Sequence, residues 1–231
     1  MKKYLVALIK ITDHPEDLVE GNLYCNRLGY FVESEEKEIG DSKEATAIVS
    51  RPHNIFNRLY RFNIQDSELL NSPVFCLYGV LGDKYCDTSK IHFDNKRLMA
   101  FGERAVIIKD VRRFLNQVDK NQPQFSYSIV RYIDFSNPRG EDERAIFNPI
   151  VKKDLRFRYQ KEFRIYSHHV DLEGAKTFYI GDLRNFTEIC ETEELYVGKD
   201  VDLKVDWNHC DINNFDRTTR KSWGKLEGSP T

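Results

Sequence analysis

Hydrophobic residues recur at every second position in several segments of this chain, a spacing typical of β-strands, whose side chains alternate between two faces. Residues 155–166 show the pattern most clearly, since apolar residues occupy the odd positions, apart from Lys161, and polar residues occupy the even positions from 156 to 164. We therefore predict a strand over 155–166 with one face on a core. Further strands are predicted at 3–11, 23–25, 45–49, 59–64, 74–81, 104–108, 125–135, 176–180, 189–197 and 201–205.

Helical spacing is clearest just after residue 110. Val111, Phe114, Leu115 and Val118 fall at i, i+3, i+4 and i+7, which places them on one apolar stripe. Asp110 precedes this stripe and is the predicted N-cap of the helix. Shorter helical segments are predicted at 15–19, at 95–101, at 149–154, at 183–186, and after residue 28, where a short helix runs into an acidic loop.

Many strands, few long helices and short connections indicate an α+β fold with a twisted, largely antiparallel sheet. Segment 74–81 is the most apolar and is expected at the centre of this sheet. No linker divides the chain cleanly, so we predict a single domain over 1–205, with a polar surface loop at 136–144. Residues 206–231 carry basic residues with few apolar ones and are predicted to form a loosely packed tail.

Composition narrows the class of protein. The chain has 231 residues and a net charge of -2, so a strong attraction to nucleic acid or acidic membranes would need a local patch. No apolar run approaches the ~20 residues that span a bilayer, and residues 1–10 are better explained as a first core strand than as a signal peptide. The cysteines are too widely spaced for a zinc or redox motif, which favours a cytoplasmic protein with reduced thiols. They are Cys25, Cys76, Cys86, Cys190 and Cys210.

Candidate chemistry lies on the even positions of the 155–166 strand. Three guanidiniums on one face are matched in geometry to phosphate or carboxylate groups. The single carboxylate, Glu162, can accept a hydrogen bond from a ribose hydroxyl or stabilise a developing positive charge. The same pattern also fits ordinary ion pairs on a solvated sheet face, and both interpretations stay open. The predicted site comprises Arg156, Arg158, Gln160, Glu162, Arg164 and, at the end of the strand, His168.

An acidic segment over residues 33–44 is the second candidate. It lacks the regular ligand order of a calcium-binding loop, so a solvated surface loop is expected. Alternatively, the segment neutralises the basic strand in space or contacts a protein partner. No histidine pair has the helical spacing of a metal site, and no metal is predicted. The acidic residues are Glu33, Glu35, Glu36, Glu38, Asp41 and Glu44.

Several short motifs, taken in chain order, resemble an uncharacterised family of bacterial and phage proteins. The resemblance covers most of residues 4–200. Proteins of this family have no assigned function and often lie on mobile elements, so the resemblance implies a phage or mobile-element origin without implying an activity. The matching residues are 21–26, 28–31, Glu33, Gly40-Asp41, Glu44, 105–108, 159–165 and 179–183.

Gln160-Lys161-Glu162 is also similar to the Gln-any-Glu strand motif of one group of ADP-ribosyltransferases. In that group the Glu binds the nicotinamide ribose of NAD and stabilises the oxocarbenium ion, and the Gln orients the acceptor. This resemblance implies catalytic roles for Glu162 and Gln160, with NAD as the cofactor.

The chain departs from that group at two places. The early strand should supply an Arg or His for the cofactor, yet residues 3–11 offer only Lys10, unless Arg27 or Arg51 replaces it. The middle strand should carry a Ser-Thr-Ser-like set, for which Ser126-Tyr127-Ser128 is a poor substitute.

The resulting hypothesis is a cytoplasmic protein of phage or mobile-element type that recognises a nucleotide or nucleic acid, with ADP-ribose transfer from NAD as its enzymatic form. Arg156, Arg158 or Arg164 would then hold phosphates. An RNase-like hydrolase using Glu162 and His168 is a further possibility, although no second histidine is well placed. The alternative is a non-catalytic inhibitor of a host or phage defence factor that binds through residues 33–44 and the basic tail.

Overall fold

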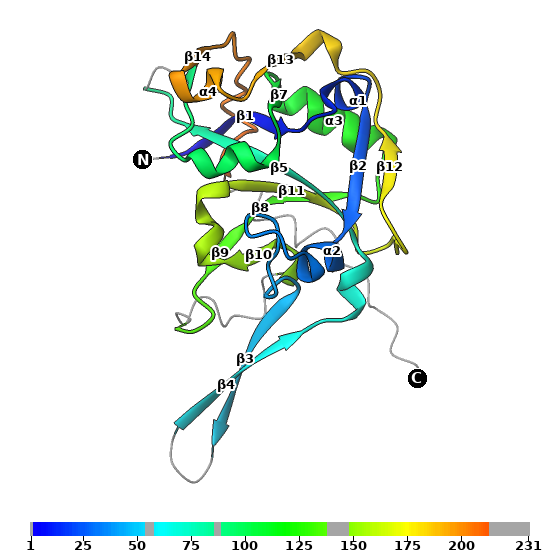
Figure 1. The fold of residues 1–231 in the computed structure, drawn as a ribbon, viewed down its shortest axis with the longest axis vertical. Helices are drawn as coiled ribbons and strands as arrows, with labels where there is room; N and C mark the ends of the chain where they lie inside the picture. Colours follow the sequence, from blue (N-terminus) through cyan, green and yellow to red (C-terminus); the bar gives the residue numbers. More distant parts are fainter. Residues whose placement is uncertain (1, 54–57, 86–88, 138–147, 213–231) are drawn as a thin grey trace.

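The computed structural model describes residues 2–53, 58–85, 89–137 and 148–212, and within them it shows an α+β domain built on an eight-stranded, mostly antiparallel sheet (Figure 1). The predicted fold class is therefore confirmed. The main path of the sheet runs β12 (Lys176–Tyr179), β2 (Asn22–Arg27), β5 (Pro73–Gly82), β1 (Tyr4–Ile11), β7 (Arg104–Ile108) and β13 (Thr187–Glu191). Off this path, β11 (Glu162–Tyr166) pairs with β5 and with β8 (Ser126–Ile129).

The apolar strand β5 lies at the centre, as its composition predicts, because it pairs with three other strands. On one edge it pairs with β11 over 74–78. On the other edge it pairs with β1 from Tyr78 onward but with β2 only at Pro73 and Val74. The strands β1 and β2 therefore diverge beside residues 75–77, and the sheet is split there.

Both faces of the sheet are covered by apolar side chains. The predicted helix forms as α3 (Val111–Asn121), with Asp110 as its N-cap: the Asp110 side chain accepts a hydrogen bond from the Arg113 N–H at 2.9 Å. The stripe of α3, including Phe114, packs in one core cluster with Leu8 of β1 and Phe163 of β11. The opposite face of the sheet forms a second core cluster. Its members include Ala7, Ile9, Tyr78, Phe93 and Ile107.

Two short helices frame the split. Helix α1 (Pro15–Val19) connects β1 to β2, and α2 (Leu28–Glu33) begins where β2 ends. Between α1 and β2 the chain turns at Gly21, whose φ of 96° favours glycine. The backbone of Gly21 packs closely against that of Gly181, and its carbonyl accepts a hydrogen bond from the Ile180 N–H at 2.8 Å.

The remaining elements form small units around the main sheet. Strand β10 (Lys152–Asp154) pairs in parallel with β9 (Arg131–Ile133), and β14 (Lys199–Asp200) pairs with β6 (Lys90–Ile91). The hairpin of β3 (Thr46–His53) and β4 (Arg58–Gln65) projects away from the rest of the molecule (Figure 1). The other short helices are η1 (Glu68–Asn71), η2 (Lys96–Phe101), η3 (Pro149–Val151), η4 (Leu155–Gln160), η5 (Arg184–Phe186) and α4 (Glu194–Val197).

The predicted strand over 155–166 is wrong in its first half. Residues 155–160 form the 3₁₀ helix η4, and only 162–166 form a strand. Asp154 caps η4 by accepting a hydrogen bond from the Arg156 N–H at 3.0 Å. Lys161 ends η4 in the left-handed region, with φ 41° and ψ 45°. Because a local cap and a left-handed residue override the alternating pattern, Arg156 and Arg158 do not share a strand face with Arg164.

Other predicted boundaries also need correction. The segment 201–205 is not a strand, and 189–197 divides into the end of β13 and helix α4. The long strand at 125–135 is interrupted between β8 and β9, and the helix expected at 149–154 ends at residue 151, before β10. Of the polar loop expected at 136–144, the part from 138 onward lies outside the described residues.

Residues 206–212, which were expected in the tail, contact the rest of the domain. The Cys210 carbonyl accepts a hydrogen bond from the Leu5 N–H at 2.8 Å, and the Trp207 ring packs edge-on against Tyr4. Residues 206–212 are thus part of the packed domain, whereas 213–231 lie outside the described residues. In the portion of the chain that the structure describes, no helix has the length and apolar character needed to cross a bilayer.

The turn between α1 and β2 gives a first test of the fold. A Cβ atom at position 21 would overlap the Gly181 carbonyl oxygen, and the positive φ strains any other residue. We expect Gly21→Ala to lower the free energy of unfolding by about 3 kcal/mol in urea denaturation. Gly174→Ala is the matched control, because nothing lies within 4 Å of its added Cβ atom. Equal stability of the two variants would contradict this account of the turn.

Candidate functional site

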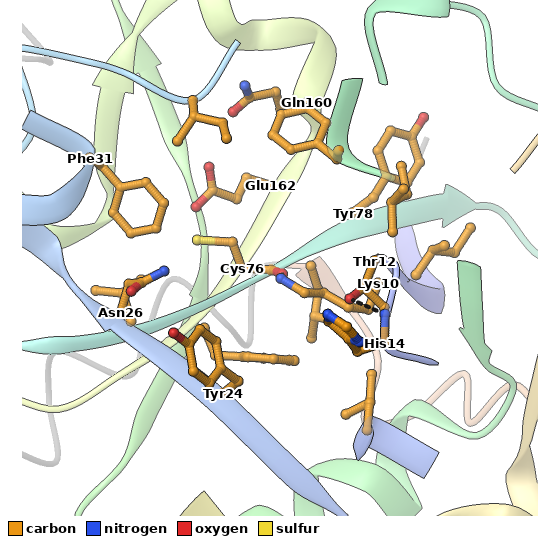
Figure 2. A pocket seen from close by; sticks show the side chains of 18 of the residues that line it. Lys10, Thr12, His14, Tyr24, Asn26, Phe31, Cys76, Tyr78, Gln160 and Glu162 are labelled. Carbon is orange, nitrogen blue, oxygen red and sulfur yellow. Dashed lines mark hydrogen bonds between the residues drawn. The ribbon is translucent and has the colours of Figure 1, made fainter. Parts of the chain in front are cut away.

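A cleft of about 730 Å³ lies at the split in the sheet (Figure 2). Its floor includes residues 75–77 of β5, the segment that neither β1 nor β2 covers. Its walls come from β1, α1, β2, α2, η2, β10, the end of η4 and the start of β11. The divergence of β1 and β2 therefore opens a recess in the middle of the sheet, where residues far apart in the sequence meet.

Strand β2 presents alternate residues to this cleft. Asn22, Tyr24 and Asn26 line it, whereas Leu23 and Cys25 between them are buried in the core. This is the two-residue period of a strand with one open face. Tyr24 is 59% exposed although its neighbours in the strand are buried in the core. An exposed aromatic side chain at the wall of a cleft is available for contact with a ligand.

Glu162 and Gln160 both line the cleft, and Figure 2 shows them on the same side of β5. The Glu162 side chain is nevertheless only 5% exposed and is held by two cations. Its Oε1 accepts a hydrogen bond from Arg164 Nε at 2.7 Å, and its Oε2 accepts one from Lys153 Nζ at 3.1 Å. Burial alone raises the pKa of Glu162, but the charges of Arg164 and Lys153 outweigh burial and lower the pKa to about 2.

Arg164 is the centre of this buried network. Its side chain is fully buried and binds Glu44 through two hydrogen bonds, Nη1 to Oε2 at 2.9 Å and Nη2 to Oε1 at 3.0 Å. Arg164 Nη1 also donates a hydrogen bond to the Ile150 carbonyl. Burial raises the pKa of Glu44, although Arg164 and Lys153 act in the opposite direction. Two carboxylates and two cations thus balance one another beneath the cleft.

The acidic segment 33–44 takes part in this network, so the expectation of a solvated loop is wrong for two of its residues. Asp41 and Glu44 are fully buried, and Asp41 Oδ2 accepts a hydrogen bond from the Asp154 N–H at 2.9 Å. The Glu38 carbonyl accepts one from Gln160 Nε2 at 2.7 Å. The alternative interpretation, in which acidic residues neutralise the basic segment, agrees with these contacts.

The other predicted site residues lie outside the cleft lining. Arg156 and Arg158 are exposed on η4, and Arg156 reaches back to the Gly40 carbonyl at 3.4 Å. Arg164 lies behind Glu162 and is not among the lining residues. His168 follows the end of β11, where its ring contacts Tyr166 and Asn148, and burial lowers its pKa. The structure therefore brings together only Gln160 and Glu162 of the predicted set at the cleft.

Two lysines at the cleft were not predicted as site residues. Lys10 lines the cleft from β1, and its Nζ donates a hydrogen bond to the Cys76 carbonyl at 3.1 Å. Within the described residues, no carboxylate lies within ion-pairing distance of Lys10. The signal for Lys10 is a single charge in the apolar run 4–11. Lys153 could not be singled out in the same way, because Lys152 beside it is also charged and the sequence does not distinguish the two.

Comparisons with other proteins add no assignment to this site. The chain matches no family model, and neither curated proteins nor solved structures gave a match. No group of three or more His, Cys, Asp or Glu residues that could hold a metal ion is found among the residues that the structure describes. The chemistry of the cleft must therefore be inferred from its own side chains.

The buried network predicts a large loss of stability when Arg164 is removed. Arg164→Met leaves Glu44 and Glu162 with Lys153 as their shared cation in place of two, and the loss of one partner from a buried ion pair costs about 3–5 kcal/mol. Urea denaturation at pH 7 measures this loss. Arg184→Met is the control, because the ion pairs of Arg184 are exposed and should contribute at most about 1 kcal/mol. A loss of that small size for Arg164→Met would show that the network does not hold the fold.

The pKa of Glu162 predicts how its contribution changes with pH. The folded protein holds this carboxyl at a pKa of about 2, below its ordinary value, so ionised Glu162 stabilises the fold at neutral pH. That contribution is about 3 kcal/mol and is lost as the pH falls from about 5 toward 2. The difference in unfolding free energy between wild type and Glu162→Gln should therefore shrink between pH 7 and pH 3. A constant difference would argue against an ionised Glu162.

Proposed function

We propose that the cleft binds a nucleotide-type ligand. As the enzymatic version of this function, we propose that the protein transfers ADP-ribose from NAD to an acceptor. The observation that supports this most directly is the meeting of Gln160, Glu162, Lys10 and several aromatic side chains in one recess. Its volume of about 730 Å³ falls within the range of roughly 300–1,000 Å³ common for small-molecule sites. The proposal includes the cytoplasmic location and the phage or mobile-element origin expected from the sequence.

The aromatic residues suit a planar base. Tyr24, Phe31 and Tyr78 line the cleft on different elements, namely β2, α2 and β5. Bases bind proteins by stacking on aromatic side chains, and each such contact contributes about 1–3 kcal/mol. Tyr24 is the best placed of the three, since it is well exposed, whereas Tyr78 is buried in the second core cluster.

The polar residues suit a sugar and a phosphate. Ionised Glu162 is an acceptor for ribose hydroxyls, and the Cys76 thiol that contacts it is a weak donor which a hydroxyl can replace. Lys10 supplies a positive charge that the described residues do not balance with a nearby carboxylate, and ammonium groups bind phosphate oxygens. Acceptor and cation thus lie in the same cleft, as a ribose phosphate requires.

The transfer reaction gives Glu162 and Gln160 separate tasks. The bond between ribose C1′ and the nicotinamide nitrogen breaks, and its electron pair leaves with neutral nicotinamide. Glu162 would stabilise the positive charge that develops on the ribose, while an acceptor nucleophile forms the new bond and loses its proton. Gln160 would orient that acceptor. Because Arg164 and Lys153 already balance Glu162, its effect on the developing charge is weaker than that of a free carboxylate.

Binding is tested with Tyr24. We expect Tyr24→Ala to weaken the binding of ADP-ribose or NAD about tenfold in isothermal titration calorimetry, because a stacking contact is lost. Tyr179→Ala is the matched control: Tyr179 is 58% exposed on the adjacent strand β12 and is not a lining residue. Equal effects of the two substitutions, or no binding of any nucleotide to the wild type, would contradict the proposal.

Turnover is tested separately with NAD labelled in its adenylate part. Label transfer to an acceptor should be lost in Glu162→Gln and retained in Arg158→Ala, whose side chain is exposed outside the cleft. Circular dichroism checks that both variants are folded. Binding without transfer would keep the nucleotide site and reject the transferase. The absence of both would favour a non-catalytic interaction protein.

A further inference from the structure

Because the sheet is split, the backbone N–H and C=O of one residue of β5, Cys76, point into the cleft and not toward another strand. Backbone N–H and C=O groups of successive strand residues point to opposite edges. The Gly79 N–H donates a hydrogen bond to the Lys161 carbonyl at 2.8 Å, and the Pro73 carbonyl accepts one from the Ser167 N–H at 3.3 Å. Odd-numbered residues of β5 therefore bond toward β11, and Cys76 points to the opposite edge.

On that edge Cys76 has no strand beside it. Its neighbours of the same orientation are paired, Tyr78 with Ile9 of β1 and Val74 with Asn26 of β2. The Cys76 carbonyl is satisfied by Lys10 Nζ at 3.1 Å. In the described part of the chain no strand pairs with Cys76 on this edge, so its N–H has no ladder acceptor there, and no turn or loop carbonyl accepts from it. Since inward-facing backbone N–H groups rarely lack a partner, this donor points to a ligand or water in the cleft.

We propose that the Cys76 main-chain N–H and the Lys10 ammonium form a subsite for a phosphate or diphosphate oxygen at the split between β1 and β2. This subsite rests on the proposed function, because it assigns the phosphate part of the nucleotide. A neutral N–H donor beside a cation is an effective combination for an oxyanion. The Lys10 side chain is already positioned by the Cys76 carbonyl and by the Phe75 ring, whose centroid is 4.7 Å from Lys10 Nζ, so little conformational freedom is lost on binding.

The charges around the subsite permit an anion. Glu162 lines the same cleft, but Arg164 and Lys153 neutralise it. Asp13 and Asp17 also line the cleft, and Asp13 Oδ1 accepts a hydrogen bond from the Glu103 N–H at 3.1 Å. The neighbouring acids therefore lower the affinity for an anion without occupying the two donors.

The position of Cys76 also indicates which part of the ligand lies on each side of β5. Its thiol contacts Glu162, whereas its N–H points into the split that Lys10 borders. Figure 2 shows Glu162 and Lys10 on opposite sides of the β5 ribbon, with Cys76 between them. A ribose at Glu162 would thus be adjacent to a diphosphate at Lys10, which is the connectivity of ADP-ribose and of NAD.

Selective labelling with ¹⁵N-cysteine tests the subsite on the full chain. The five cysteines give at most five amide signals, and Cys76→Ser assigns the one that matters. Titration with inorganic pyrophosphate should shift the Cys76 amide signal, while the signals of Cys190 and Cys210 stay in place. In Lys10→Gln, which removes the charge but keeps a hydrogen-bond donor at the end of the side chain, the apparent affinity should fall at least tenfold. Lys120→Gln, an exposed change of equal charge on α3, is the control.

The outcomes separate this inference from the proposed function. A Cys76 shift with pyrophosphate, without binding of any nucleotide, would support the subsite and refute the nucleotide function. Nucleotide binding that leaves the Cys76 amide signal unmoved would overturn the subsite and keep the function. Scattered shifts that are equal in Lys10→Gln and Lys120→Gln would indicate an adventitious ion only, and would also overturn the subsite.

Discussion

Charge neutrality beneath the cleft is the constraint on which the rest of this structure depends. Glu44, Lys153, Glu162 and Arg164 are buried together, and each can stay ionised only because the others are in place. They come from the acidic segment, from β10 and from β11, so the requirement to pair them draws these segments onto one side of β5. The pairing also fixes Glu162 at the cleft, and the same contacts serve folding and the candidate site.

The second constraint is the divergence of β1 and β2. Helix α1 connects these strands, and β2 reaches β5 only at its end, which leaves part of the central strand uncovered. A continuous sheet would bury residues 75–77 and close the recess. The protein instead uses Lys10 to satisfy the exposed Cys76 carbonyl. The charged residue in the core strand β1 is therefore explained by the gap in the sheet, because Lys10 bonds the carbonyl that the gap leaves without a strand partner.

The sequence predicted the α+β class, the α3 helix with its Asp110 cap, the central β5 and two residues that line the cleft. These features depend on local periodicity or on a cap, both of which are visible in a single segment. The change from 3₁₀ helix to strand at Lys161 could not be predicted, because the alternation of 155–166 favours a strand throughout, whereas the helix depends on the Asp154 cap and the left-handed Lys161. The sequence left open that the acidic segment neutralises the basic strand, but the pairing of Arg164 with Glu44 in particular could not be predicted, since these positions are 120 residues apart.

The left-handed backbone of Lys161 has a consequence for the Gln160-Lys161-Glu162 motif. In a regular strand the outer two side chains would share a face by geometry alone, whatever residue stood between them. Here Gln160 belongs to a helix and Glu162 to a strand, so the φ of 41° at the middle residue sets their separation. Asparagine or glycine would adopt that conformation more readily than lysine. The middle position of the motif is thus not neutral: its backbone preference determines whether the amide and the carboxylate can act on one molecule.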